Sequence, residues 1–211
     1  MKAAISSLCV IVILVSSAGV HAQDSANRRF EIVPYGGAAW SRGYDVLLGA
    51  QKGNLDIKDS AMWGVALDYA VKDSLTQIEV LYNRQDTDLA FDLDGQKTDI
   101  TAVSVEYLHV GALLGVERGD VLWYTSFSLG TTRFAPKEGT SGDEWRFSIM
   151  FGLGGKYYFN DRLGVRVQAR APYMFVEDSA KFYCGDSGCL NSAGGRGIWQ
   201  FDLSLGLVVR L

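Results

Sequence analysis

Residues that could carry out a reaction are scarce in this chain of 211 residues. Its two histidines are His21 and His109, and acid–base or nucleophilic catalysis needs such a group held beside a partner. The sequence offers no evident partner for His109, so we expect an interfacial side chain within a strand. We therefore predict no catalytic residues, no metal ligands and no cofactor.

Two short motifs suggest ligands, and each has a simpler explanation. Residues 85–99 are rich in aspartate, and Asp92-Leu93-Asp94-Gly95 resembles part of a calcium loop. The full spacing of an EF-hand is absent, so we expect a solvated loop that engages divalent cations among lipopolysaccharide phosphates. Arg118-Gly119-Asp120 matches an integrin-binding tripeptide, but ordinary turn chemistry explains it.

The cysteines comprise Cys9 near the N-terminus and a close pair, Cys184 and Cys189. An even number of cysteines in an exported domain predicts a disulfide, which here joins Cys184 to Cys189. A loop this small gains roughly 2 kcal/mol from chain entropy. The bond would therefore stiffen a loop without holding the fold together.

Any site must be positioned by strands, because the dominant pattern of the sequence is a two-residue alternation. From Trp199 to Leu211 every second residue is apolar, and most residues between them are small, polar or charged. Side chains of a β-strand point alternately to opposite faces. One face of this strand is therefore continuously apolar.

Eight runs share this alternation, and the links between them alternate in length. Short links lie at 72–74, 118–120 and 160–162. Long, polar links lie between them and at either side, at 41–59, 85–99, 135–143 and 177–197. We predict an all-β fold, an eight-stranded antiparallel transmembrane up-and-down β-barrel with short periplasmic turns and long extracellular loops. The runs lie at 29–40, 60–71, 75–84, 100–117, 121–134, 144–159, 163–176 and 198–211.

Alternation alone does not say which face points into the barrel. A soluble lipocalin-like barrel has the same period, with its apolar face inward. In the run 144–159 the polar face mixes small and charged residues, such as Gly152, Gly154 and Lys156. A crowded interior of eight strands needs small residues between its charges, whereas a water-facing surface does not. We therefore predict that the apolar face contacts lipid.

This choice of faces places a nearly balanced set of charges in the lumen. Buried charges persist only when they are paired and hydrogen-bonded, so we expect a salt-bridge network that plugs the barrel. The alternative is a narrow polar pore in which Arg166 and Arg170 attract anions. The predicted network comprises Glu31, Asp68, Glu79, Glu106, Glu144, Arg146, Lys156, Arg166, Arg170, Asp202 and Arg210.

Aromatic residues gather near the ends of the predicted strands. Two aromatic girdles at the membrane interfaces produce such a distribution, whereas aromatic core filling in a soluble barrel does not favour strand ends. The predicted girdle residues are Trp40, Trp63, Trp123, Trp145, Tyr157, Phe159 and Trp199.

The N-terminal segment, residues 1–22, predicts a signal peptide. Lys2 precedes an apolar run from Ile5 to about Val15, and Val20-His21-Ala22 supplies a cleavage site. Residues 23–211 then form one barrel domain, exported through the periplasm to the outer membrane. Without Lys2 the domain has 19 basic and 24 acidic residues, which gives no reason to expect nucleic acid as a partner.

Several segments also resemble those of small Gram-negative outer membrane β-barrel proteins of the OmpA/OmpX-like group. The resemblance covers most of the domain and implies an eight-stranded barrel inserted by the barrel-assembly machinery. That machinery usually reads a final aromatic residue, where this chain has Leu211. The similar segments are 105–112, 128–134, 154–159, 161–170 and 199–202.

Three hypotheses of function follow. The first is a structural and surface-interaction scaffold with a filled lumen and four external loops, since rigid scaffolds commonly carry specificity in loops. The second is a small channel or passive carrier for a small solute, and the third, weaker hypothesis is a lipid-modifying enzyme. Expected partners are outer membrane lipid and lipopolysaccharide, the barrel-assembly machinery, and an unknown extracellular ligand at the loops.

Overall fold

The computed structural model describes residues 29–41, 44–48, 51–71, 75–93, 96–137, 143–176, 181–185, 188–192 and 197–211. The predicted signal peptide, residues 1–22, lies outside these ranges, so its prediction is not tested. All regular elements in the described ranges are β-strands. No helix in these ranges is long and apolar enough to cross a membrane.

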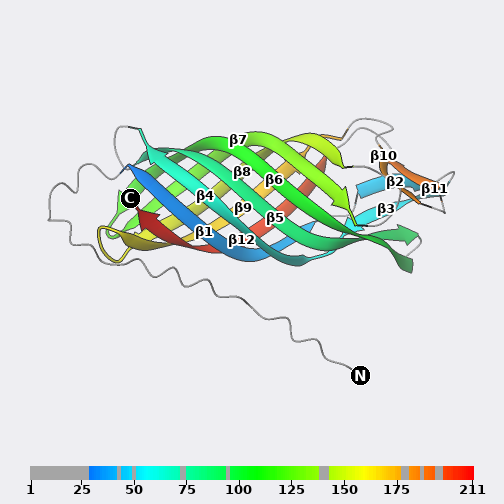
Figure 1. Cartoon of the computed structure of the whole chain (residues 1–211), viewed down its shortest axis with the longest axis horizontal. Helices are drawn as coiled ribbons and strands as arrows, with labels where there is room; N and C mark the ends of the chain where they lie inside the picture. Colours follow the sequence, from blue (N-terminus) through cyan, green and yellow to red (C-terminus); the bar gives the residue numbers. More distant parts are fainter. Residues whose placement is uncertain are drawn as a thin grey trace, which may run out of the picture.

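Eight strands form a closed antiparallel barrel, which confirms the predicted fold class (Figure 1). Consecutive strands of the wall pair with one another, and the pairing of β12 with β1 completes the ring. The wall consists of β1 (Phe30–Ser41), β4 (Ser60–Ala70), β5 (Thr76–Leu93), β6 (Gln96–Arg118), β7 (Val121–Pro136), β8 (Glu144–Tyr158), β9 (Leu163–Met174) and β12 (Ile198–Arg210).

The two faces of the wall are distributed as the polarity of the residues predicts. In β12 the side chains of Gln200 and Asp202 are buried, whereas those of Leu203 and Leu205 are 50% and 61% exposed. A soluble barrel with an apolar interior would show the reverse burial. The apolar face of the barrel therefore points outward.

Short links connect the strands at the end of the barrel where β1 begins and β12 ends. The amide of Leu211 donates to the carbonyl of Phe30 at 2.9 Å, so the start of β1 and the C-terminal residue lie together at this end. Gly119, with a positive φ of 62°, forms the turn between Arg118 and Val121. The Arg118-Gly119-Asp120 tripeptide is therefore part of a tight turn.

At the opposite end, the strands extend beyond the predicted limits. Residues 85–99 were predicted as a loop, and this is wrong: β5 and β6 remain paired as far as Leu93 and Gln96. Thr87 and Leu89 are buried, whereas Asp86 and Asp88 are exposed. Alternation thus continues outside the membrane, where both faces include polar residues and the hydrophobic period is weak.

Two further hairpins occupy the predicted long links 41–59 and 177–197. They consist of β2 (Tyr44–Leu48) with β3 (Gln51–Ile57), and β10 (Lys181–Gly185) with β11 (Gly188–Ser192). β3 pairs with β5, and β11 pairs with β2, so both hairpins continue the sheet of the wall (Figure 1). The sequence did not predict these four strands.

The backbone of the β10–β11 hairpin pairs Cys184 directly with Cys189. Their side chains lie outside the described part of the structure, so the disulfide stays a prediction. Directly opposed residues of an antiparallel pair are close enough for a disulfide to form.

Protein purified without reductant and unfolded before alkylation is expected to carry no alkylated cysteine at Cys184 or Cys189. After reduction, mass spectrometry should show both positions modified, and the Cys184→Ser variant should show Cys189 modified without reduction. The heat-induced gel shift of the barrel should not change on reduction, because the bond closes only a small loop. Modification of both cysteines before reduction would contradict the disulfide.

Candidate functional site in the barrel lumen

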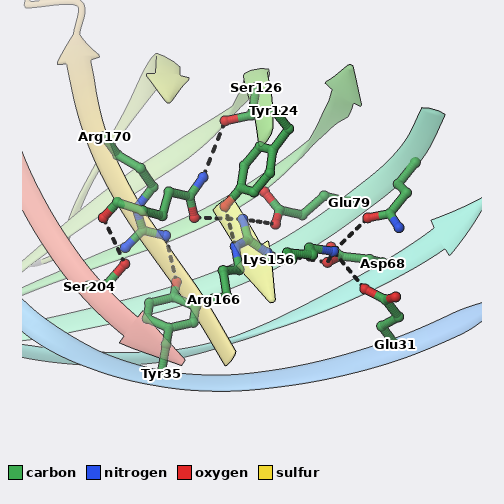
Figure 2. Close-up of polar contacts among 12 residues, drawn as sticks. Glu31, Tyr35, Asp68, Glu79, Tyr124, Ser126, Lys156, Arg166, Arg170 and Ser204 are labelled. Atoms are coloured by element: carbon green, nitrogen blue, oxygen red, sulfur yellow. Dashed lines mark hydrogen bonds and ion pairs between the residues drawn. The ribbon is translucent and has the colours of Figure 1, made fainter. Parts of the chain in front are cut away.

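The ammonium group of Lys156 on β8 is the centre of a charge cluster near the short-turn end of the lumen. It lies 2.6 Å from Glu31 Oε2 on β1 and 2.7 Å from Asp68 Oδ2 on β4 (Figure 2). It also donates to Gln77 Oε1 on β5 at 2.6 Å. Lys156 is 0% exposed. One side chain therefore links four strands across the barrel.

Arg166 extends this cluster toward the middle of the lumen (Figure 2). Its guanidinium lies 3.2 Å from Asp68 Oδ2 and 2.6 Å from Glu79 Oε2, and its Nε donates to the Tyr124 hydroxyl at 2.7 Å. At the other side of the cluster, Arg210 Nε donates to Glu31 Oε1 at 2.9 Å. Each carboxylate of this cluster thus has a cationic partner, as buried charges require.

Arg170 forms a second ion pair in the lumen. Its Nε donates to Asp202 Oδ1 at 2.8 Å, and its Nη1 donates to the Tyr35 hydroxyl at 2.9 Å. The guanidinium also lies 4.6 Å from the centroid of the Tyr35 ring, within the range of a cation–π contact. Arg170 and Asp202 are both 3% exposed, so the pair is closed to bulk water.

His109 lies inside the lumen, so the prediction of an interfacial side chain without a partner is wrong. Its Nδ1 is 3.2 Å from Ser128 Oγ, and its Nε2 is 2.8 Å from Ser148 Oγ. A histidine beside serines is a pairing that nucleophilic enzymes use. Here the imidazole is 1% exposed, and both serines are buried. The group fills the lumen and offers no open face to a substrate.

The structure brings most of the predicted charge network together, but not all of it. Arg146 and Glu144 form a separate pair of 2.9 Å at the long-link end of β8. Glu106 was predicted in the lumen, and this is wrong: its neighbours Val105 and Tyr107 are buried, and Glu106 itself points outward. The charges that meet in the lumen are Glu31, Asp68, Glu79, Lys156, Arg166, Arg170, Asp202 and Arg210.

The neutral partners of these charges were not predicted from the sequence. Tyr35 on β1 and Tyr124 on β7 are at positions whose side chains point into the lumen, between neighbours that point outward. Farther along the lumen, Tyr107 donates to Gln200, and Gln200 donates to Gln85. The signal that could have identified them is their inward position, because a buried hydroxyl or amide needs a partner.

The family of the chain follows from a sequence profile. The profile of the outer membrane protein beta-barrel domain matches residues 10–210. The chain belongs to this family. The outer membrane is therefore its location, the short-turn end of the barrel is periplasmic, and the long hairpins are extracellular.

Two solved outer membrane barrels show the same fold. Neisserial surface protein A has a TM-score of 0.59 and 13% identity, with 86% of this chain and 97% of that chain covered. OprG from Pseudomonas aeruginosa has a TM-score of 0.60 and 11% identity, with 90% and 99% covered. At such identities the likeness concerns the fold alone. A search of curated proteins returned no match.

All of the predicted girdle residues of this outer-membrane barrel point outward. Trp123, Tyr157 and Phe159 lie near the periplasmic ends of their strands, and Trp40 and Trp63 lie near the extracellular ends. Such positions suit aromatic side chains at the two membrane interfaces. The exposed girdle side chains are Trp40, Trp63, Trp123, Trp145, Tyr157, Phe159 and Trp199.

The extracellular part of the interior is apolar, in contrast to the ionic part near the periplasm. Leu55 and Ile57 of β3 are each 2% exposed and pair in register with Phe91 and Leu89 of β5. They belong to one buried apolar cluster with Val103. The interior is thus filled by ion pairs at one end and by packed apolar side chains at the other.

Proposed function

We propose that this outer-membrane barrel is a closed scaffold that presents its extracellular hairpins to partners at the cell surface. The complete burial of Lys156 among its anionic partners carries this proposal, because an open conduit would leave that ammonium in contact with water. Specificity would then reside in the hairpins β2–β3, β5–β6 and β10–β11. We propose no reaction for the barrel, and insertion by the barrel-assembly machinery remains a prediction.

A second candidate, a narrow channel for a small solute, is favoured by one observation. Asp68 Oδ1, Asn83 Oδ1 and Gln85 Nε2 are buried and have no hydrogen-bond partner within the described residues. Buried polar atoms without a protein partner commonly bind ordered water. Water at these atoms would provide the start of a polar path along β4 and β5.

Conductance of the folded protein in planar lipid bilayers separates the two candidates. We expect no conductance steps from the native barrel at moderate voltage, because Arg170 and Lys156 are each held in buried ion pairs. Steps in the native protein that disappear in Arg166→Ala or Arg170→Ala would overturn the scaffold and support the channel. The Arg118→Ala variant, changed in an exposed periplasmic turn, is the control for altered insertion.

A further inference from the structure

Three charged residues form a row across the outer surface of β5, β6 and β7. Arg84, Glu106 and Arg133 are register partners on these strands, and we call them the outer ladder. Glu106 Oε1 accepts from Arg84 Nη1 at 3.0 Å, and Glu106 Oε2 accepts from Arg133 Nη1 at 2.9 Å. Glu106 is on the same face of β6 as Leu108, which is 54% exposed. The ladder therefore faces the membrane side of the wall.

The outer ladder interrupts the extracellular ring of aromatic side chains. Trp63 on β4 is the register partner of Arg84, and Trp145 on β8 is the register partner of Arg133. The guanidinium of Arg133 lies 5.8 Å from the centre of the Trp145 ring. Charged and aromatic residues in one row place the ladder where headgroups of the outer leaflet begin.

Within the described strands, the periplasmic ends of β5, β6 and β7 carry no such row of paired charges on their outer face. Ile78 of β5, Leu114 of β6 and Trp123 of β7 are there, and they are 45%, 62% and 53% exposed. Arg118, the last residue of β6, lies on the same face as Glu106, but its register partner is Val121. Ion pairs that only connect neighbouring strands would be expected at either membrane interface. The restriction of this paired row to the extracellular interface points to a group that only the outer leaflet presents.

The exposure of the ladder suits an anionic group. The side chains of Arg84 and Arg133 are 34% and 32% exposed, whereas that of Glu106 is 13% exposed beneath them. Lys137 adds a third cation, 3.3 Å from Asp86. Guanidinium groups bind phosphate oxygens through directed pairs of N–H donors, and cationic side chains at this depth bind lipid headgroups.

Besides Glu106, two carboxylates accompany these cations. Asp86 accepts hydrogen bonds from Arg84 and Ser104, which lower its pKa to about 2, and Asp143 accepts from Arg133 at 3.0 Å. Both acids lie on the extracellular side of the ladder, and their side chains are 45% and 46% exposed. Carboxylates at this height could bind the divalent cations that bridge phosphates in a headgroup layer, since such cations take oxygen ligands.

We propose that the outer ladder binds the phosphate groups of the phosphorylated glycolipid in the outer leaflet. This assignment rests on the outer-membrane location and does not depend on whether the lumen conducts. The lipid binds from the side of the barrel, between Trp63 and Trp145, with its phosphates on Arg84 and Arg133 and its acyl chains along the apolar wall below.

Native mass spectrometry of the folded barrel in detergent, titrated with bisphosphorylated lipid A, tests the proposal. The Arg84→Gln/Arg133→Gln variant should bind about tenfold more weakly than the native protein, as expected from the loss of two partly exposed charge contacts. The control Arg118→Gln/Arg162→Gln removes two exposed cations from periplasmic turns and should bind like the native protein. Equal affinity of all three proteins would overturn the proposal.

Two further measurements identify the bound group. Dephosphorylated lipid A should bind the native protein as weakly as phosphorylated lipid A binds the double variant. Inorganic phosphate at millimolar concentration should not displace the lipid; displacement would show a site for free phosphate and overturn the lipid assignment.

A Glu106→Gln variant separates lipid binding from a structural role of the ladder. It removes the anion shared by the two arginines and should bind phosphorylated lipid A at least as tightly as the native protein. If the ladder only connects the strands, the Glu106→Gln variant should instead lose both folding and lipid binding. That result would contradict the proposal. The heat-induced gel shift reports folding for every variant.

Discussion

The Lys156→Met variant is expected to lose about 3 kcal/mol of unfolding free energy, the magnitude found when one partner of a buried ion pair is removed. Lys156 is 0% exposed and lies 2.6 Å from Glu31 and 2.7 Å from Asp68. Methionine fills a similar volume but carries no charge. The variant therefore leaves two buried carboxylates with excess negative charge, although Arg210 and Arg166 still contact them.

Urea unfolding of the refolded barrel in lipid vesicles, followed by tryptophan fluorescence, measures this loss. Lys137→Met is the matched control, because Lys137 is half exposed and its ion pair with Asp86 should contribute at most about 1 kcal/mol. The double variant Lys156→Met/Asp68→Asn removes one charge of each sign and should be more stable than Lys156→Met alone. A double variant that loses the sum of the two single effects would show that Lys156 and Asp68 are not coupled.

The partners of Lys156 could not be predicted, although its face could. Two-residue alternation assigns Lys156, Glu31 and Asp68 to the interior. Whether their side chains contact one another depends on the position of each residue along the barrel axis. The register of all eight strands together determines these positions. Lys156 and Glu31 are 125 positions apart in the sequence, and no local pattern contains that register. The composition of the lumen was thus predictable, and its pairing was not.

The error at Glu106 has a different physical cause. In this part of β6 both faces are apolar, with Val105 and Tyr107 inward and Leu108 outward. Polarity therefore cannot assign a face to Glu106, since the usual contrast between the two faces is missing. The extracellular parts of β5 and β6 were missed for a related reason, because polar residues occupy both faces of these strands there, such as Thr87 inward and Asp86 outward.

Adjacent glycines on β8 provide the sharpest test of the face assignment, because Gly154 points into the lumen and Gly155 points toward lipid. A Cβ atom on Gly154 would lie 2.5 Å from both the Tyr124 hydroxyl and the Val167 carbonyl oxygen. The nearest neighbour of a Cβ on Gly155 would be the Val121 side chain at 3.3 Å. The lumen at Gly154 thus has room for the tyrosine only while position 154 has no side chain.

The Gly154→Leu variant is therefore expected to lose at least about 3 kcal/mol of stability or to yield no folded band on an unheated gel, since overpacking forces neighbours to move. The displaced neighbour would be Tyr124, whose hydroxyl accepts from Arg166 at 2.7 Å, so the clash also disrupts the charge cluster. Gly155→Leu should stay within about 1 kcal/mol of the native barrel, because it adds apolar surface facing lipid. The comparison uses the same substitution one residue apart. If Gly155→Leu were the damaging variant instead, the two faces of β8 would have to be exchanged, and with them the placement of Lys156 in the lumen.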